Sequence, residues 1–373
     1  MQALSLCLCG VFLLGIHQPQ RHREHRGCTE KSAVWTFRAK LKCLFPVGEY
    51  PALSRQMITA SDLKSIAGLP ILLEVESSGL SAVRWAEEYQ EDIRRLIESQ
   101  GALLIRGLKV LGSADFGKTI STLFGSELLE YVYRSTPRTQ MRGNVYTATE
   151  YPAAQVIPQH NENSYSRTWP NRLGFLCLLR AETGGETPIG DSRVVYNMLP
   201  EFVRVKFEEK GVLYVRNYST LDLPWSVVFQ TEDRSEVEAF CEANELNYEW
   251  LDNNRLRTRQ VNPAVAVHPH TGERVWFNQA HLFHASSLGH EIMDTLLDSL
   301  GEENLPRNSY YGDGEPIEPG VLEVIRNTYE QTKVKFAWQK NDLLLLDNML
   351  FTHGREPYTG PRTVLVGMAC PNH

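Results

Sequence analysis

The chain has 373 residues, of which 42% are hydrophobic and 22% are charged, so it can bury a substantial core in one large domain or two modest ones. Its formal net charge of -7 and its pI near 5.9 give no general attraction for nucleic acid. No basic stretch interleaved with aromatic residues follows the N-terminal region, and nucleic-acid binding is therefore set aside.

The seven cysteines are an odd number, and those in the main body lack the paired spacing of a zinc knuckle. This usage indicates a reduced, intracellular enzyme. Cys177 and Cys241 are expected to pack as small apolar groups.

Residues 1 to about 50 differ in composition from the rest of the chain. The apolar run over 1–16 is too short for a membrane span, and no positive charge precedes it, as a secretory signal would require. Three interpretations stay open: a targeting leader, a disordered extension or a wrongly assigned start. We expect the functional domain over 51–373, without a stable membrane span, in the cytoplasm or an organelle.

Helical and strand patterns alternate in the first part of this domain. In chain order, we predict a strand over 69–76, a helix over 82–101, a strand over 102–108 and a helix over 113–125. Gly101 should end the first helix, and Ser113 should cap the second. From about 130 to 195 the chain is rich in Tyr, Thr, Pro and Gly without a helical period, which predicts strands and functional loops.

Helices return in the second half of the chain. In chain order, we predict a helix over 199–211, a strand over 212–219, a helix over 233–245, a hairpin over 263–278, a helix over 320–333, an apolar run over 342–351 and a closing strand over 362–370. Thr271 and Gly272 form a good turn pair for the hairpin. Because no internal repeat or low-complexity linker occurs over 60–373, we predict one domain, mostly β with flanking α-helices.

A His-x-Glu pair is the first chemical signal. His160 and Glu162 are two residues apart, so on an extended chain their side chains point to the same face. The spacing alone is weak evidence, since His22 and Glu24 form the same pair in the N-terminal region. His353, which follows the apolar run "LLLLDNMLF", supplies a third partner. Two histidines and one carboxylate form the facial triad of non-heme Fe(II) oxygenases, which leaves coordination positions open.

Four sequence motifs, in order, carry a resemblance to a known family. They are "YTATEYP" (146–152), "HNENSYSRTWP" (160–170), "GGETPIGDSR" (184–193) and "DNMLFTHGREPYTGPR" (347–362). Together they resemble the TauD/TfdA family of Fe(II)- and 2-oxoglutarate-dependent dioxygenases, in particular its clavaminate-synthase-like and syringomycin-pathway-like hydroxylases. The similarity runs from about 65 to 371. It implies a double-stranded β-helix, or jelly-roll, core with flanking helices.

The resemblance also implies roles for individual residues. It assigns the iron ligands to His160, Glu162 and His353, and the distal carboxylate of 2-oxoglutarate to Thr187 and Arg362. The planar fork of an arginine matches a carboxylate, and a threonine hydroxyl can add a hydrogen bond. Arg355 is a rival for this carboxylate, but the family spacing favours Arg362.

The implied reaction uses O2 to couple the oxidative decarboxylation of 2-oxoglutarate to hydroxylation of a C–H bond, giving succinate and CO2. Glu162 favours hydroxylation, because related halogenases carry a small residue in its place. Val366 stands where sulfonate-hydroxylating relatives place a second arginine, which argues against taurine as substrate. The expected substrate is a small molecule, either an amino acid, free or carrier-bound, or a small amine.

Other residues near the triad are weaker candidates. Tyr165 and Trp169 follow the ligand pair and could line the pocket or a lid, with core packing as the alternative. Asn278 ends an apolar strand and could face the cavity. The remaining histidines of the second half are expected at the surface or in the hairpin: His268, His270, His281, His284 and His290.

Two alternatives from other functional classes stay open. One is a non-catalytic protein of the same fold that binds a small acid or a partner, and the complete triad argues against it. The other is a zinc hydrolase that uses the same three ligands. A hydrolase would not need Arg362 and Thr187, so succinate formation distinguishes it from an oxygenase.

Overall fold

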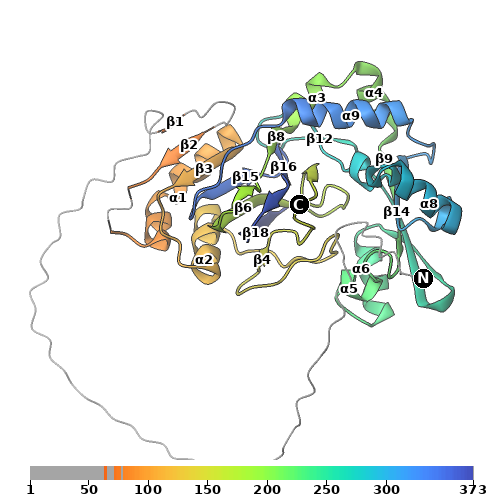
Figure 1. Cartoon of the computed structure of the whole chain (residues 1–373), viewed down its shortest axis with the longest axis horizontal. Coiled ribbons are helices and arrows are strands. Elements are labelled where there is room, and N and C mark those ends of the chain that lie inside the picture. The colour runs from red at the N-terminus through yellow and green to blue at the C-terminus, as the bar shows by residue number, and fades with distance from the viewer. Residues whose placement is uncertain (1–62, 65–70, 77–78, 373) are drawn as a thin grey trace, which may run out of the picture. The chain divides into compact units, whose positions relative to one another are not determined.

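The largest sheet joins segments from both ends of the described chain (Figure 1). The computed structural model describes residues 63–64, 71–76 and 79–372, so the predicted N-terminal leader lies outside it, and its boundary at residue 50 stays a prediction. In spatial order, the seven strands are β1 (Leu63–Lys64), β2 (Leu72–Glu74), β3 (Ala102–Arg106), β15 (Leu343–Asp347), β6 (Pro170–Leu179), β18 (Thr363–Pro371) and β4 (Val145–Thr147). β2 pairs with β3 in parallel, and the other neighbours are antiparallel.

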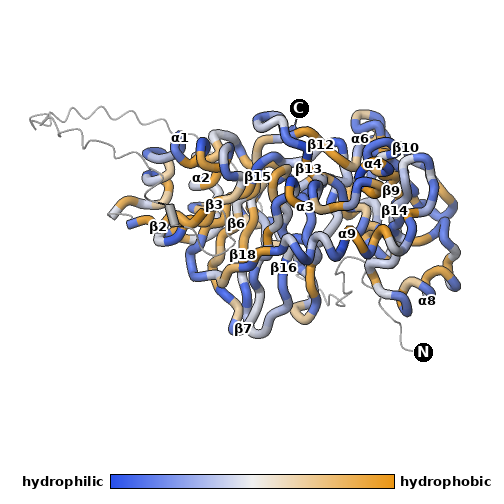
Figure 2. Tube along the Cα trace, turned by 90° about the horizontal axis from the view of Figure 1, so that it is seen from above, coloured by the Kyte–Doolittle hydropathy of each residue, from blue (hydrophilic) through white to orange (hydrophobic). Residues whose placement is uncertain are grey.

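The predicted apolar run over 342–351 contains β15, whose leucines are buried on both faces of this sheet. Leu343 and Leu345 pack in a hydrophobic cluster with residues of α1 (Ala82–Gln100) and α2 (Ser113–Phe124), and the two helices lie beside the sheet in Figure 1. Leu344 and Leu346 belong to the cluster on the opposite face. Successive side chains of a strand point to opposite faces, so a strand covered on both sides is apolar throughout. Figure 2 shows the resulting hydrophobic stretches along β3, β6 and β15.

The helix predicted over 82–101 is confirmed, including its two ends. The Ser81 side chain accepts a hydrogen bond from the backbone N–H of Arg84, and Gly101 ends the helix with a left-handed φ of 78°. The predicted cap of the second helix is wrong. Ser113 is the first helical residue, Gly112 precedes it as the N-cap, and no side chain caps the helix.

A three-stranded sheet lies against the face of the large sheet that α1 and α2 do not cover. Its order is β5 (Ile157–His160), β16 (Phe351–Arg355) and β8 (Ile189–Asp191), with antiparallel pairing. Ile189 and Phe351 share a buried cluster with Phe175 of β6 and Val364 of β18. The two sheets therefore enclose a common hydrophobic core. β7 (Thr183–Gly184), just before β8, and β17 (Tyr358–Thr359), just after β16, form a short antiparallel pair.

A second group of elements builds another core. A four-stranded sheet has the order β10 (Asn247–Leu251), β11 (Arg255–Asn262), β9 (Val212–Tyr218) and β14 (Arg307–Tyr311). The helices of this part of the chain are α3 (Ser192–Met198), α4 (Glu201–Lys210), α5 (Trp225–Phe229), α6 (Arg234–Ala243), α7 (Ala280–Phe283), α8 (His290–Leu300) and α9 (Pro319–Thr332). From the sequence we predict α4, α6 and α9 but not α8, although α8 also carries apolar residues at helical spacing. Cys241 of α6 is buried and free, as is Cys177 of β6, which confirms their predicted packing.

The predicted hairpin is also confirmed. β12 (Val265–Val267) pairs with β13 (Arg274–Trp276), and Gly272 in the connecting turn has a φ of 70°. The prediction of sheets with flanking helices holds, but the described chain is a mixture of α and β rather than mostly β. In the part of the chain that the structure describes, we find no helix long and apolar enough to cross a membrane.

Candidate active site

The three-stranded sheet brings the two histidines of the predicted triad together. His160 ends β5, and the antiparallel pairing places it directly opposite His353 of β16. The two ring centroids are 4.5 Å apart. Glu162 follows β5, and its Oε2 lies 3.6 Å from Nε2 of His353. One ligand atom from each of the three residues lies within 4.8 Å of the others, so a single metal ion can contact all three.

The His160 ring is held in the form that a metal requires. Its Nδ1 lies 2.8 Å from the carbonyl oxygen of Pro158, which can only accept, so Nδ1 carries the proton and Nε2 keeps its lone pair. Desolvation and the neighbouring His353 lower the pKa of His160 to about 4. The ring is therefore neutral at pH 7 and available as a metal ligand.

Glu162 is the buried carboxylate of the site, and Arg138 holds it. Nη2 of Arg138 donates to Oε2 of Glu162 at 2.7 Å, and both side chains are 3% exposed. Burial alone would raise the pKa of Glu162, but Arg138 and the two histidines lower it below its usual range. Glu162 is thus ionised in the absence of any metal, as a ligand must be.

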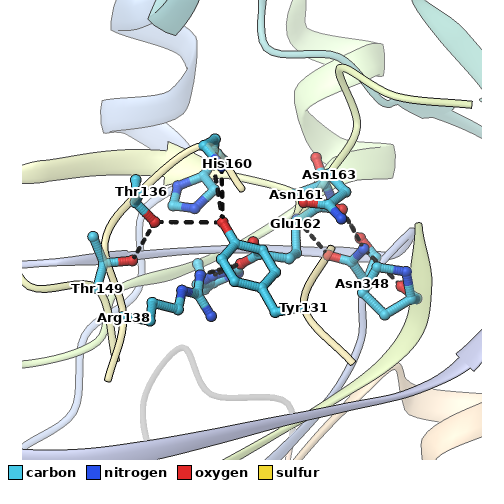
Figure 3. Close-up of polar contacts among 12 residues, drawn as sticks. Tyr131, Thr136, Arg138, Thr149, His160, Asn161, Glu162, Asn163 and Asn348 are labelled. Atoms are coloured by element: carbon cyan, nitrogen blue, oxygen red, sulfur yellow. Dashed lines mark hydrogen bonds and ion pairs between the residues drawn. The ribbon is translucent and has the colours of Figure 1, made fainter. Parts of the chain in front are cut away.

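The backbone around Glu162 is held by Asn348, which lies between β15 and β16. The Oδ1 of Asn348 accepts a hydrogen bond from the Glu162 N–H at 2.7 Å, and its Nδ2 donates to the Glu162 carbonyl at 2.9 Å (Figure 3). Nδ2 of Asn161 donates in turn to the Asn348 carbonyl. These bonds connect the loop after β5 to the turn before β16, so the carboxylate and His353 keep their relative positions.

A cavity borders the triad and is lined by both predicted cosubstrate residues. His160, His353, Thr187 and Arg362 line it, together with the apolar Phe175 and Val364. Nε of Arg362 donates to the carbonyl of Gly185 at 2.9 Å, and Oγ1 of Thr187 accepts from Nε1 of Trp338 at 3.1 Å. Among the described residues, we find no acceptor for the two Nη atoms of Arg362. The cavity therefore joins a metal-binding triad to a guanidinium that can bind an anion.

Arg355, the rival for the cosubstrate carboxylate, lines the same cavity but is committed to the protein backbone. Its Nη1 donates to the carbonyl of Tyr151, and its Nη2 donates to those of Pro152 and Gln155, at 2.6 to 2.7 Å. These bonds hold the loop over 151–155 and occupy the outer edge of the guanidinium.

Burial and the nearby Arg355 lower the pKa of Arg362 to about 10, which leaves Arg362 charged at neutral pH.

A second, larger cavity borders the same triad. It shares Arg138, Thr149 and His160 with the smaller cavity and also reaches Glu162. Its apolar wall is formed by residues that include Leu282, Phe283 and Leu288. This larger cavity is the natural place for a substrate.

The three weaker substrate candidates do not line either cavity. The Tyr165 hydroxyl donates to the carbonyl of Tyr133, and its ring packs in the core of the second group of elements. Trp169 packs against Phe277. Asn278 uses its Nδ2 to bond the Ala264 carbonyl and its Oδ1 to accept from Ala280 at the start of α7. Gln279, the next residue, lines the larger cavity instead.

Two of the remaining histidines are buried. His268 lies in the hairpin, as expected, whereas His281 lies in α7, neither at the surface nor in the hairpin. His268 is 1% exposed, and its Nε2 lies 3.1 Å from Asp347, which also pairs with Arg172. His281 is 3% exposed and lies 3.1 Å from the Gln159 carbonyl through its Nε2. In both cases a distant partner supplies the hydrogen bond that makes burial of the imidazole tolerable.

The sequence pattern misses Arg138 and Asn348, although both hold Glu162. Arg138 lies in the stretch without helical period, where it resembles any other loop arginine. Asn348 offers a weak signal, because "DN" interrupts the apolar run just before β16. A polar pair within such a run indicates buried hydrogen bonds.

Comparison with known proteins agrees with this geometry. A model of a family described as taurine catabolism dioxygenase TauD, TfdA family matches residues 66–369. The dapdiamide synthesis protein DdaC of Enterobacter agglomerans is 40% identical over 280 residues, which cover 75% of this chain and 85% of that protein. A clavaminate synthase-like protein of Arabidopsis thaliana is 34% identical over 286 residues, covering 73% of this chain and 82% of that protein.

Solved structures with a similar arrangement are more distant in sequence. PvcB from Pseudomonas aeruginosa is 16% identical with a TM-score of 0.48, and the match covers 80% of this chain and 84% of PvcB. A taurine dioxygenase from Burkholderia xenovorans is 14% identical with a TM-score of 0.47, covering 81% of this chain and 86% of that one. The family assignment therefore rests on the sequence matches.

The four motifs of the sequence lie within the matched range, and each of them contributes residues to the triad or to the cavity beside it. Membership of an oxygenase family favours redox chemistry over a zinc hydrolase or a non-catalytic binder. The predicted cofactors, Fe(II) and 2-oxoglutarate, are those of this family. The chain belongs to the TauD/TfdA family of dioxygenases.

Proposed function

We propose that the protein is an Fe(II)- and 2-oxoglutarate-dependent hydroxylase of a small amino-acid-derived substrate or amine, free or carrier-bound. One observation carries the proposal: a single cavity is lined by the two histidines of the triad and by Arg362 and Thr187. Two neutral imidazoles and one ionised carboxylate fit Fe(II) and leave coordination positions open. A hydrolase or a simple metal site would have no use for the guanidinium in the same cavity.

Bound Fe(II) and 2-oxoglutarate would supply the chemistry, in which O2 is activated, a C–H bond is hydroxylated, and succinate and CO2 are released. His160, Glu162 and His353 would hold the metal. Arg362 and Thr187 would orient 2-oxoglutarate through its distal carboxylate, with a two-pronged ion pair and one hydrogen bond. Phe175 and Val364 would limit the access of water to this cavity.

The ligand set supports hydroxylation rather than halogenation. Glu162 is present, buried and held by Arg138 and Asn348, so the site offers no vacancy for chloride in its place. Val366, at the position of a second arginine in sulfonate-hydroxylating relatives, is 0% exposed and packs in the core between the two sheets. It offers no charge to a sulfonate, which supports a substrate other than taurine.

The proposal extends to the fold. We assign the seven-stranded and three-stranded sheets to the two halves of a double-stranded β-helix, with His160 and Glu162 near one strand end and His353 on the neighbouring strand. The common core that contains Phe175, Val364, Ile189 and Phe351 supports this assignment. Dependence on Fe(II) and 2-oxoglutarate supports the predicted intracellular location.

Succinate formation by the purified full chain tests the proposal. Fe(II), 2-oxoglutarate and O2 are supplied together with a panel of amino acids, amines and their acyl derivatives, and stimulation of succinate release is measured. A substrate-stimulated, Fe(II)-dependent release is expected. If the native metal is zinc and no succinate forms with any metal, a hydrolase becomes the better assignment.

A further inference from the structure

Arg138 carries a buried charge that the protein only partly neutralises. Its side chain is 3% exposed, and it lines both cavities. Nη2 donates to Glu162, whereas Nε and Nη1 are buried without a hydrogen-bond partner among the described residues. Buried guanidinium donors are normally satisfied, so two unpaired nitrogens indicate that a ligand completes the site.

The charge balance around Arg138 changes when a metal binds. Glu162 is the counterion of Arg138 in the structure, but in the proposed function its charge is shared with a divalent cation. Among the residues that line the larger cavity, all of them described, Glu162 is the sole acid. The other cation there, Arg307, is already paired with Asp222 through two bonds of 2.6 and 2.8 Å. Arg138 is therefore the cation that lacks a dedicated anion once the metal is bound.

The surroundings of Arg138 fit a carboxylate. Its guanidinium lies over the Tyr131 ring, 4.7 Å from the centroid, which fixes the plane of the fork. The hydroxyls of Thr136 and Thr149 line the larger cavity and are 3.5 Å apart, a distance at which they are only weakly paired with each other (Figure 3). They can therefore turn to donate to an anion that approaches Arg138.

We infer that Arg138 binds a carboxylate beside the triad, through Nε and Nη1 and with help from the two threonine hydroxyls. The inference rests on the proposed function. The carboxylate belongs either to the substrate or to the keto-acid end of 2-oxoglutarate. In the first case the substrate is an acid whose apolar portion contacts Leu282, Phe283 and Leu288. The larger cavity offers a free ammonium group no acidic side chain except Glu162, which the proposed function assigns to the metal.

Calorimetric titration of the full chain tests this inference without turnover. Mn(II) replaces Fe(II) because it prefers similar ligands and does not start the reaction. The Mn(II)-loaded protein is titrated with 2-oxoglutarate, and the resulting complex is titrated with hexanoate or hexylamine, two probes of similar size and opposite charge. The wild type is expected to bind hexanoate at least tenfold more tightly than hexylamine, unless 2-oxoglutarate occupies Arg138.

Two variants locate the effect, and a third controls for it. Arg138→Gln removes the charge. Arg138→Lys keeps a positive charge opposite Glu162 but lacks the planar fork of the guanidinium, so this second variant should fold even if Arg138→Gln does not. Arg142→Gln changes an exposed arginine of the same segment and should alter no affinity. At least a tenfold loss for hexanoate with unchanged 2-oxoglutarate binding assigns Arg138 to the substrate, and the reverse assigns it to the cosubstrate.

Other outcomes overturn the inference. Unchanged affinities for both carboxylates in the folded Arg138 variants would leave Arg138 only a structural role toward Glu162. Preference of the wild type for hexylamine over hexanoate, together with unchanged 2-oxoglutarate binding in the Arg138 variants, would also contradict the inference. Failure of the wild type to bind Mn(II) would be a different result, because it would overturn the proposed function on which the inference depends.

Discussion

Replacement of Arg362 by methionine is the most direct test of the cosubstrate site. Methionine fills a similar volume but removes the guanidinium, whose two Nη atoms have no acceptor among the described residues and line the cavity of the triad. The proposed metal ligands lie on β5, on the loop after it and on β16, and should be unaffected. We therefore expect Arg362→Met to lose 2-oxoglutarate binding while it retains metal binding.

The magnitude follows from the hydrogen bonds that the variant loses. A fork-to-carboxylate pair has two charge-assisted hydrogen bonds, each contributing about 1.5–3 kcal/mol. Because Arg362 is only partly buried, solvent screening reduces this sum, and about 3 kcal/mol is a reasonable expectation. This corresponds to a roughly hundredfold increase in the dissociation constant of 2-oxoglutarate.

Isothermal titration of the Mn(II)-loaded protein with 2-oxoglutarate measures this change directly. Arg355→Met is the matched variant, because Arg355 lines the same cavity but donates to the backbone of residues 151–155. It should lower the stability to unfolding more than it lowers the affinity. A normal affinity in Arg362→Met together with a large loss in folded Arg355→Met would refute the assignment and transfer the role to Arg355.

Three further predictions concern other parts of the molecule. His353→Ala should weaken Mn(II) binding at least tenfold in a metal titration, since it removes one of three ligands; unchanged binding would refute its role. Gly185→Ala should weaken 2-oxoglutarate binding, because the new Cβ would lie 3.0 Å from Cδ of Arg362, whereas Gly272→Ala, at a similar φ but in open space, should cost only stability. Burial, and secondarily Arg326, lowers the pKa of His281 to about 3 in the folded protein. Between pH 3 and about 6.5, His281 is therefore protonated in the unfolded chain but not in the folded protein. The contribution of neutral His281 to the free energy of unfolding is complete above about pH 6.5 and falls by about 1.4 kcal/mol per pH unit as the pH falls toward 3. Denaturant unfolding of His281→Gln should therefore show a shallower pH dependence than that of the wild type.

Local patterns were sufficient for the elements whose side chains repeat with a clear period. The helix over 82–100 has an apolar face and a glycine end, and the hairpin has a turn glycine between two β-rich runs, so both follow from short-range preferences. The His160–Glu162 pair was recognised from its local spacing, but β5 ends at His160, so the loop after β5 and not the period of a strand places Glu162 beside His353. α8 was not predicted, although its apolar residues Ile292, Leu296 and Leu300 also recur at helical spacing, so the same short-range preferences apply to it.

The sequence by itself determined the family and the candidate metal ligands in their order, since the motifs that contain them are contiguous. Only the tertiary structure decided which residues support them. The pairing of β5 with β16 puts His160 opposite His353, and it brings Asn348 to the backbone of Glu162. Arg138 reaches the same carboxylate from a loop without any periodic pattern. Such contacts depend on long-range packing, in which each buried charge or amide needs one partner at one distance, and no short-range preference encodes that partner.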